Sequence, residues 1–212
     1  MTKIKNIIFD LGGVLLNIDY SKTSNTFKKL GVANFDEVYS QAKQTTLFDD
    51  FETGKISAKD FISQAKSLLG LNCTNEEIIV AWNAMLLDFP KERMELLINL
   101  KANYNIVLLS NTNELHKNAF DKIIYEQNQL KGLDDIFDKT FYSHEIGLRK
   151  PNNDCFEFVL SSCNFDKNET VFFDDSIQHI HGAESSGIKS YYVSRGKLIT
   201  DYFDINFELI NT

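Results

Sequence analysis

The fold is decided by the stretch Ile7-Ile8-Phe9-Asp10-Leu11-Gly12-Gly13-Val14-Leu15-Leu16, in which a short apolar run ends in a carboxylate and two glycines. Residues 7–9 predict a buried parallel strand, because the run is too short and too β-branched for a helix. Asp10 then stands at the carboxyl end of that strand, which is where ligands bind in open α/β sheets. An aspartate at such a junction can also serve only a turn, so its role depends on the residues at the ends of the other strands.

The composition is that of an ordinary globular chain. Its 212 residues, 43% hydrophobic and 25% charged, suffice for a sizeable core in one or two domains. The net charge of −8 argues against a nucleic-acid partner, and no polybasic run or spanning apolar stretch indicates a membrane. Asp10 also interrupts the short apolar run that would otherwise resemble a signal peptide. The three cysteines, which form no CxxC pair, indicate a reducing compartment, so we expect a cytoplasmic protein.

A long helical excursion follows the first strand. Apolar residues at three- and four-residue spacing predict helices near residues 20–31, 34–47, 57–71 and 75–88. A strand-to-helix connection usually takes about 2–6 residues, whereas here roughly 80 residues separate the first strand from the helix that should return the chain. The pattern therefore predicts a helical domain, residues 17–88, inserted as a lid into a core formed by residues 1–16 and 89–212.

From residue 89 onward, the sequence predicts helices and strands in alternation. The sequence predicts helices near 91–101, 113–128, 152–163 and 176–186, and strands near 106–109, 137–142, 170–173 and 190–193. Such alternation predicts an α/β fold with a doubly wound, mostly parallel sheet. The tail, residues 197–212, fits either a short helix or an edge strand.

Polar residues follow three of the predicted strands at the point where each ends. They are Asp10 after the first strand, Ser110 and Asn111 after the second, and Asp174 and Asp175 after the fourth. A single lysine, Lys150, precedes Pro151 just before the helix that leads to the fourth strand. Each of them also has an ordinary role open to it, as a helix cap, a dipole partner or a surface charge. Three carboxylates at neighbouring strand ends would repel one another unless a cation lies between them. The set therefore suits Mg²⁺ together with a phosphate.

Four motifs in this order resemble those of the haloacid dehalogenase-like hydrolases. They are Phe9-Asp10-Leu11-Gly12-Gly13, Leu109-Ser110-Asn111, Gly147-Leu148-Arg149-Lys150-Pro151 and Phe172-Phe173-Asp174-Asp175-Ser176. The resemblance covers nearly the whole chain, and the inserted helices follow the first motif as in members with a C1-type cap. Within the insert, Phe51-Glu52-Thr53-Gly54-Lys55-Ile56 resembles the sugar-phosphate phosphatases and the phosphatase domain of soluble epoxide hydrolase. The resemblance implies a Rossmann-like core with strand order 5-4-1-2-3, which puts the ends of strands one, two and four side by side.

The resemblance also implies a role for each acid. Asp10 would be the nucleophile that forms an aspartyl-phosphate, and as a carboxylate it needs no activating base. Mg²⁺ would be held by Asp10, by the backbone carbonyl of Gly12 and by Asp175 directly, with Asp174 acting through water. His179, four residues after Asp175, would share its helix face and is a candidate for orienting the metal-binding acid.

The remaining motif residues would hold the phosphate. Ser110 and the backbone amides at Asn111 would bind its oxygens, while Lys150 neutralises the group in transfer. The implied activity is Mg²⁺-dependent hydrolysis of a small phosphorylated metabolite by a monomer or homodimer.

The sequence departs from the family pattern at Gly12, where most of the phosphatases carry an aspartate that acts as acid and then base. A positioned proton donor is typically worth about 10²–10⁴ in rate. Three explanations are open: an acidic leaving group, as in a sugar 1-phosphate; a proton from Asp19 or Glu52 in the insert; or slow turnover by a protein that chiefly binds phosphorylated ligands. The first is our working hypothesis. A metal-independent 2-haloacid dehalogenase is a further alternative, against which the Asp174-Asp175 pair argues.

Overall fold

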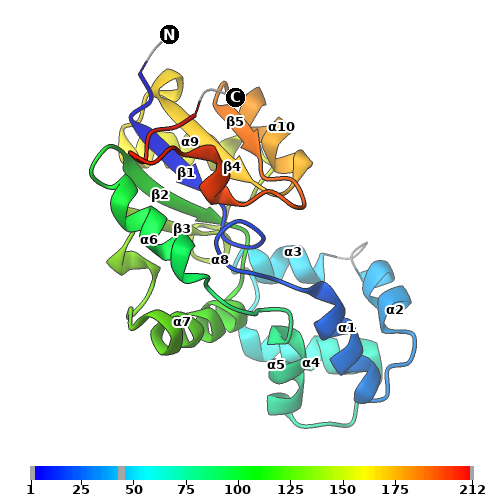
Figure 1. Cartoon of the computed structure of the whole chain (residues 1–212). Helices are drawn as coiled ribbons and strands as arrows, with labels where there is room; N and C mark the ends of the chain where they lie inside the picture. The colour runs from blue at the N-terminus through cyan, green and yellow to red at the C-terminus, as the bar shows by residue number, and fades with distance from the viewer. Residues whose placement is uncertain (1–2, 43–45, 211–212) are drawn as a thin grey trace.

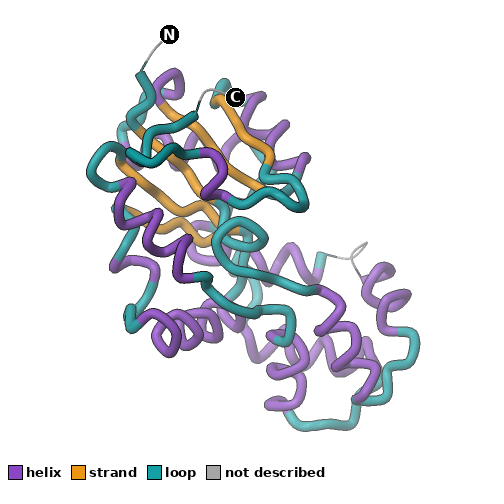
Figure 2. Tube along the Cα trace, in the orientation of Figure 1, coloured by secondary structure: helices purple, strands orange, loops and turns teal. Residues whose placement is uncertain are grey.

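A computed structural model of the chain describes residues 3–42 and 46–210 and contains a five-stranded parallel sheet (Figure 1). The strands are β1 (Asn6–Phe9), β2 (Asn105–Ser110), β3 (Lys139–Tyr142), β4 (Thr170–Asp174) and β5 (Lys189–Tyr192). Their order across the sheet is β3-β2-β1-β4-β5, and Figure 2 shows them side by side. The predicted doubly wound sheet and its strand order are confirmed.

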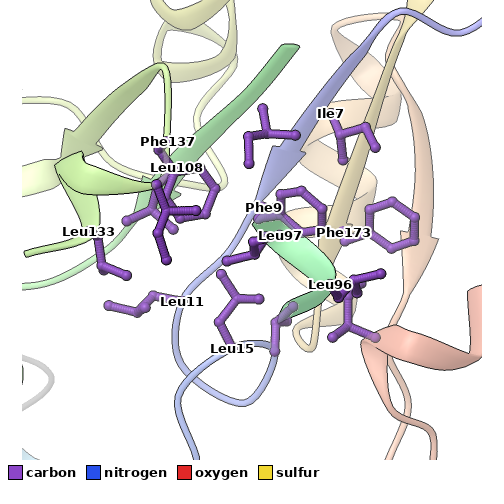
Figure 3. Close-up of a cluster of buried hydrophobic side chains, with 14 of the residues drawn as sticks. Ile7, Phe9, Leu11, Leu15, Leu96, Leu97, Leu108, Leu133, Phe137 and Phe173 are labelled. Atoms are coloured by element: carbon purple, nitrogen blue, oxygen red, sulfur yellow. The ribbon is translucent and has the colours of Figure 1, made fainter. Parts of the chain in front are cut away.

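Alternate residues of β1 face opposite layers of helices. Ile7 and Phe9 belong to a buried cluster with Leu97 of α6 (Lys91–Leu100) and Phe120 of α7 (Glu114–Asn128), part of which appears in Figure 3. Ile8 packs on the other face, against α9 (Asn153–Cys163) and α10 (Ile177–Ser185). Since both faces of the strand are covered, its register is fixed and its carboxyl end has one position relative to its neighbours.

Five helices lie between β1 and α6 in the sequence and gather away from the sheet (Figure 1). They are α1 (Tyr20–Lys29), α2 (Phe35–Ala42), α3 (Leu47–Glu52), α4 (Ala58–Leu69) and α5 (Asn75–Asn83). Their core is aromatic: Trp82 stacks on Phe48 at 5.7 Å between centroids and meets Phe61 at 4.8 Å. Ser57 caps α4, and Thr74 forms a capping box with Glu77 at the start of α5, as their spacing indicates.

Two extended segments join this bundle to the sheet. Ile18 and Leu86 form an antiparallel bridge, and the Asn17 side chain donates a hydrogen bond of 3.1 Å to the Asp88 carboxylate. The helix predicted over 75–88 is therefore too long, because α5 ends at Asn83 and the residues after it return to the core by pairing with the outgoing segment.

Other helix and strand boundaries also differ from those predicted from the sequence. The helix expected over 34–47 corresponds to α2, which is described as far as Ala42, and residues 43–45 lie outside the described residues; α3, beyond it, was not predicted. A short helix, α8 (Ser143–Ile146), follows β3, and three 3₁₀ helices occur at η1 (Leu133–Asp135), η2 (Lys167–Glu169) and η3 (Ile199–Tyr202). The described part of the tail therefore forms a helical turn, followed by one bridge between Phe203 and Leu209, rather than an edge strand.

None of the helices within residues 3–42 and 46–210 combines the length and apolar character needed to cross a membrane.

Candidate active site

The acid at the end of β1 lies in the middle of the sheet edge. Asp10 is 6% exposed, and its backbone N–H donates to the carbonyl of Phe173 on β4. Ser110 closes β2 on one side of it, and Asp174 closes β4 on the other. The side-by-side placement expected for these three residues follows from the register of the strands.

Lys150 bridges two of these acids. Its Nζ lies 2.6 Å from Asp10 Oδ1 and 2.7 Å from Asp174 Oδ2, and the side chain is fully buried. A buried ammonium between two carboxylates is charge-paired and hydrogen-bonded, which is the condition under which burying such a charge is tolerated. The site thus holds one fixed positive charge beside the candidate nucleophile.

Asn111 fixes the backbone of Lys150. Its side-chain amide donates to the Lys150 carbonyl at 2.8 Å and accepts from the Lys150 N–H at 2.9 Å. This double contact ties the loop after β2 to the loop that carries the lysine. The Asn111 side chain therefore positions Lys150, a function that its motif position alone did not indicate.

The three acids of the sheet edge are spaced to hold a cation. Asp10, Asp174 and Asp175 each offer a carboxylate oxygen, and these oxygens lie within 4.8 Å of one another. Gly13, at φ +78°, lies so close to Asp175 that a Cβ there would come within 2.1 Å of its Oδ2. An all-oxygen set of this size fits Mg²⁺, and the glycine allows the turn after β1 to approach the acid.

Asp174 is saturated by donors from the protein. Besides Lys150, it accepts from the Ser176 N–H at 2.7 Å and lies 2.9 Å from His179 Nδ1. The expectation that His179 shares a helix face with Asp175 is wrong, because α10 begins only at Ile177 and leaves Asp175 outside the helix. His179 therefore reaches back to Asp174.

Burial and charge set the ionisation of the acids. Burial raises the pKa of Asp10 to about 7, assisted by repulsion from Asp174 and Asp175 and opposed by Lys150. The pKa of Asp175 is also raised, by burial and by Asp174. Burial raises the pKa of Asp174 too, but Lys150 and His179 outweigh it and hold the pKa below its usual value. Asp174 therefore stays ionised, while Asp10 gains most from an added cation.

A cavity of about 180 Å³ lies between the helical bundle and the loop after β2. Its polar lining includes Tyr20, Thr23, Asp36, Glu52 and Thr112. Hydroxyls and carboxylates of this kind suit a small hydroxylated ligand.

Trp82 and His116 also line this cavity, although no sequence pattern indicated a role for either. The His116 ring stacks on the indole at 5.3 Å, and its Nδ1 lies 2.8 Å from Asn83 Oδ1. Burial lowers the pKa of His116 to about 3, so the ring is neutral and contributes shape and hydrogen bonding rather than charge.

The two acids considered as replacements for an acid at position 12 have other partners. Asp19 caps α1 by accepting from the Ser21 N–H at 2.9 Å. Glu52 pairs with Arg149 Nη2 at 3.0 Å, and Arg149 also contacts Asp49. Of the two, Glu52 lines the cavity between the bundle and the loop after β2, and Asp19 does not.

Comparison with known proteins finds one family model and several phosphatases that this chain resembles over most of its length. Residues 4–187 match the model of the haloacid dehalogenase-like hydrolases. A D-ribitol-5-phosphate phosphatase from Bacteroides thetaiotaomicron is 33% identical over 193 residues, which cover 91% of this chain and 93% of that protein. A sesquiterpene phosphatase from Aspergillus oryzae is 28% identical, covering 91% of each chain. A solved haloacid dehalogenase family enzyme from B. thetaiotaomicron, in complex with magnesium and inorganic phosphate, superposes with a TM-score of 0.87 at 33% identity, covering 95% of this chain and 100% of that one.

Proposed function

The chain belongs to the haloacid dehalogenase-like hydrolases, and from that membership we propose that it is a Mg²⁺-dependent phosphatase of small phosphorylated metabolites. The observation that carries the proposal is the buried Lys150, which touches both Asp10 and Asp174 within reach of a three-carboxylate cation site. One fixed cation and one cation site around a nucleophilic carboxylate are what transfer of a charged phosphoryl group requires.

Asp10 is the proposed nucleophile. Its carboxylate attacks phosphorus while the ester P–O bond breaks, and the leaving oxygen takes a proton; water then hydrolyses the aspartyl-phosphate. Lys150 neutralises negative charge on the group in transfer without moving, because Asp10, Asp174 and Asn111 already hold it in place. The Ser110 hydroxyl and the backbone N–H at Asn111 are the proposed donors to the remaining phosphate oxygens.

The cofactor is Mg²⁺, which when bound offsets repulsion between the nucleophile and the phosphate. Asp10, Asp175 and the carbonyl of Gly12 are its proposed direct ligands. Asp174 is assigned an indirect role through water, which is supported by its existing bonds to Lys150, Ser176 and His179.

The helical bundle is the proposed lid. We assign residues 17–88 to this cap and residues 1–16 and 89–212 to the catalytic core. The cavity between α1, α5 and the loop after β2 supports this division, because it gives the organic part of a substrate a place beside the candidate phosphate-binding residue Asn111.

The substrate follows from the missing acid at position 12. A phosphate on an anomeric oxygen leaves more easily without protonation, so a sugar 1-phosphate is our first candidate. The relative named D-ribitol-5-phosphate phosphatase favours a second candidate, a polyol or pentose phosphate with a primary alkoxide leaving group. The hydroxyl-rich lining of the cavity accommodates either.

Phosphate release from p-nitrophenyl phosphate tests the reaction. We expect turnover that needs Mg²⁺, is abolished by EDTA and falls by at least about 10³ in Asp10→Asn, because the nucleophile is lost. Lys91→Gln, on exposed α6 surface, is the matched control and should retain wild-type rates. Turnover that persists in Asp10→Asn would disprove the assignment, and release of halide from chloroacetate without metal would favour the dehalogenase alternative.

The three cysteines support a cytoplasmic location. Cys73, Cys155 and Cys163 are all free thiols. Burial raises the pKa of Cys155 to about 12, which makes it an inert core residue. Free thiols of this kind are typical of a reducing compartment.

A further inference from the structure

A second, larger cavity of about 410 Å³ adjoins the cation site on the side of the turn after β5. Gly13 and Asp175 line it, and Tyr20 lines both this cavity and the one between the bundle and the β2 loop. Its charged lining differs from that of the first cavity: Asp36 and Glu52 face the first, whereas Arg93, Arg195 and Lys197 gather around the second. In a chain of net charge −8, three cations around one cavity require an explanation.

Arg93 is the anchor of this group. It projects from the first turn of α6 and is 7% exposed. Its Nη1 is buried and, among the described residues, has no hydrogen-bond partner. Burial lowers the pKa of Arg93, while the nearby charges of Glu92 and Asp88 favour its charged form. A buried guanidinium with an unused donor is costly unless a ligand completes it.

Arg195 and Lys197 come from a different element. They lie on the exposed turn after β5, which is closed by a hydrogen bond from the Lys197 N–H to the Ser194 carbonyl. The Lys197 ammonium lies 5.5 Å from the centre of the Tyr202 ring. The turn thus places two exposed cations at the rim of a cavity whose wall holds a third, buried one.

We propose that this cavity binds a phosphate-type dianion beside the cation site, with Arg93 as its buried anchor and Arg195 and Lys197 as its rim. Guanidinium groups bind phosphate oxygens through paired, charge-assisted hydrogen bonds, and Arg93 lines this cavity with a largely buried side chain. Among the residues that line the cavity, three cations stand beside one carboxylate, Asp175, and the charges of Glu92 and Asp88 also act on Arg93. The dianion comes either from the second phosphate of a bisphosphorylated substrate or from free inorganic phosphate.

Binding of inorganic phosphate without Mg²⁺ tests the site independently of catalysis. At pH 8 in EDTA, the catalytic edge presents three carboxylates against Lys150 and repels phosphate, so calorimetric binding reports the second cavity. We expect Arg195→Gln/Lys197→Gln to bind phosphate about tenfold more weakly than the wild type. Lys91→Gln, which removes a charge from α6 outside the cavity, should bind within about twofold of the wild type.

The double variant changes only exposed side chains, so it tests the site even if Arg93→Gln fails to fold. Equal phosphate binding by the wild type, the double variant and Lys91→Gln would overturn the proposal, as would an absence of binding to the wild type at millimolar phosphate. Neither result bears on Mg²⁺-dependent turnover of p-nitrophenyl phosphate, which is measured separately.

A pair of sugar phosphates distinguishes the two sources. With Mg²⁺ and the Asp10→Asn protein, affinities for fructose 6-phosphate and fructose 1,6-bisphosphate are compared with and without the rim substitutions. If the rim substitutions weaken only the bisphosphate, the site takes the second phosphate of a substrate. If they weaken neither sugar phosphate but abolish binding of inorganic phosphate, the site takes the free anion.

Discussion

The two adjacent glycines of the first turn have different physical requirements. At Gly13 an added Cβ would come within 2.1 Å of Asp175 Oδ2, and the backbone has φ +78°, so only glycine fits. At Gly12 the nearest atom to an added Cβ is Ile18 Cδ1 at 3.3 Å, the end of a flexible side chain. A Cβ at position 12 therefore requires the end of the Ile18 side chain to move by only a few tenths of an ångström, and φ at Gly12 is not in the left-handed region.

Gly12→Asp should therefore restore a proton donor at small structural cost. We expect kcat/KM to rise by about 10²-fold or more for ribose 5-phosphate, whose alkoxide needs protonation, and by much less for ribose 1-phosphate. Steady-state rates on the two isomers, with the melting temperature as a check on folding, measure the effect. Equal gains on both substrates would contradict the leaving-group explanation for Gly12.

The candidate site residues could be located from the sequence wherever their position depends on strand ends. Asp10, Ser110 and Asp174 follow recognisable apolar runs, and the parallel register brings them together. His179 was misplaced because the start of α10, two residues after Asp175, decides which acid it meets. His116 could not be found at all, since its role depends on Trp82 packing across from another element.

At the scale of elements, hydrophobic periodicity predicted which segments are helices better than where they end. Residues 84–88 continue a helical pattern, yet 84 and 85 form a turn and Leu86 pairs with the outgoing segment at Ile18. That pairing is a tertiary contact between residues far apart in sequence, and local propensity does not contain it. The short α8 was missed for a similar reason: its Ser143 is buried and holds the Thr112 backbone by two hydrogen bonds of 2.9 Å.

The close approach of the turn after α3 to α8 yields a prediction about the position of the helical bundle. Gly54, at φ +69°, lies so close to the core that an added Cβ would come within 2.1 Å of the His144 carbonyl, whereas Gly70, at φ +62°, has no atom within 4 Å. Alanine at either position costs about 1 kcal/mol for the left-handed backbone. Gly54→Ala should in addition push the bundle from the core.

Comparing Gly54→Ala with Gly70→Ala separates the effect of backbone strain from the effect of moving the helical bundle. We expect Gly54→Ala to lower kcat/KM on p-nitrophenyl phosphate by about tenfold or more beyond Gly70→Ala, since small displacements of positioning groups are costly. The melting temperatures of the two variants measure the destabilisation that both share from the left-handed backbone. Loss of activity of equal size in both variants would show that the approach of Gly54 to His144 has no part in positioning the helical bundle on the core.

At the scale of the whole molecule, the long interval between the first strand and its returning helix was the feature that indicated an inserted bundle. The structure shows why such an insertion is tolerated: both connecting segments leave and re-enter at one place, joined by the bridge at Ile18 and the contact between Asn17 and Asp88. The two sheet faces keep their own helix layers undisturbed. How the bundle sits against the sheet edge, and hence the shape of the cavity between the bundle and the loop after β2, could not be predicted from the sequence because it depends on these tertiary contacts.

The concentration of acids at one sheet edge links metal binding to the stability of the whole chain. Without metal, burial raises the pKa of Asp10 to about 7, with repulsion from Asp174 and Asp175 in the same direction. The folded chain therefore holds this proton more tightly than the unfolded chain. The free energy of unfolding should accordingly fall as the pH rises from about 4 to about 7.

Mg²⁺ should reverse that trend, because it binds the ionised carboxylate. Below pH 7 the cation must displace a proton, so its affinity should be about 30-fold weaker at pH 5.5 than at pH 8 from Asp10 alone. The rise in melting temperature caused by millimolar Mg²⁺ should be correspondingly larger at pH 8. Calorimetric titration at both pH values measures the affinity directly, and in Asp10→Asn this difference should shrink. An Mg²⁺ affinity that is the same at pH 5.5 and pH 8 would show that Asp10 is not a ligand, and the proposed cation site would have to be placed elsewhere.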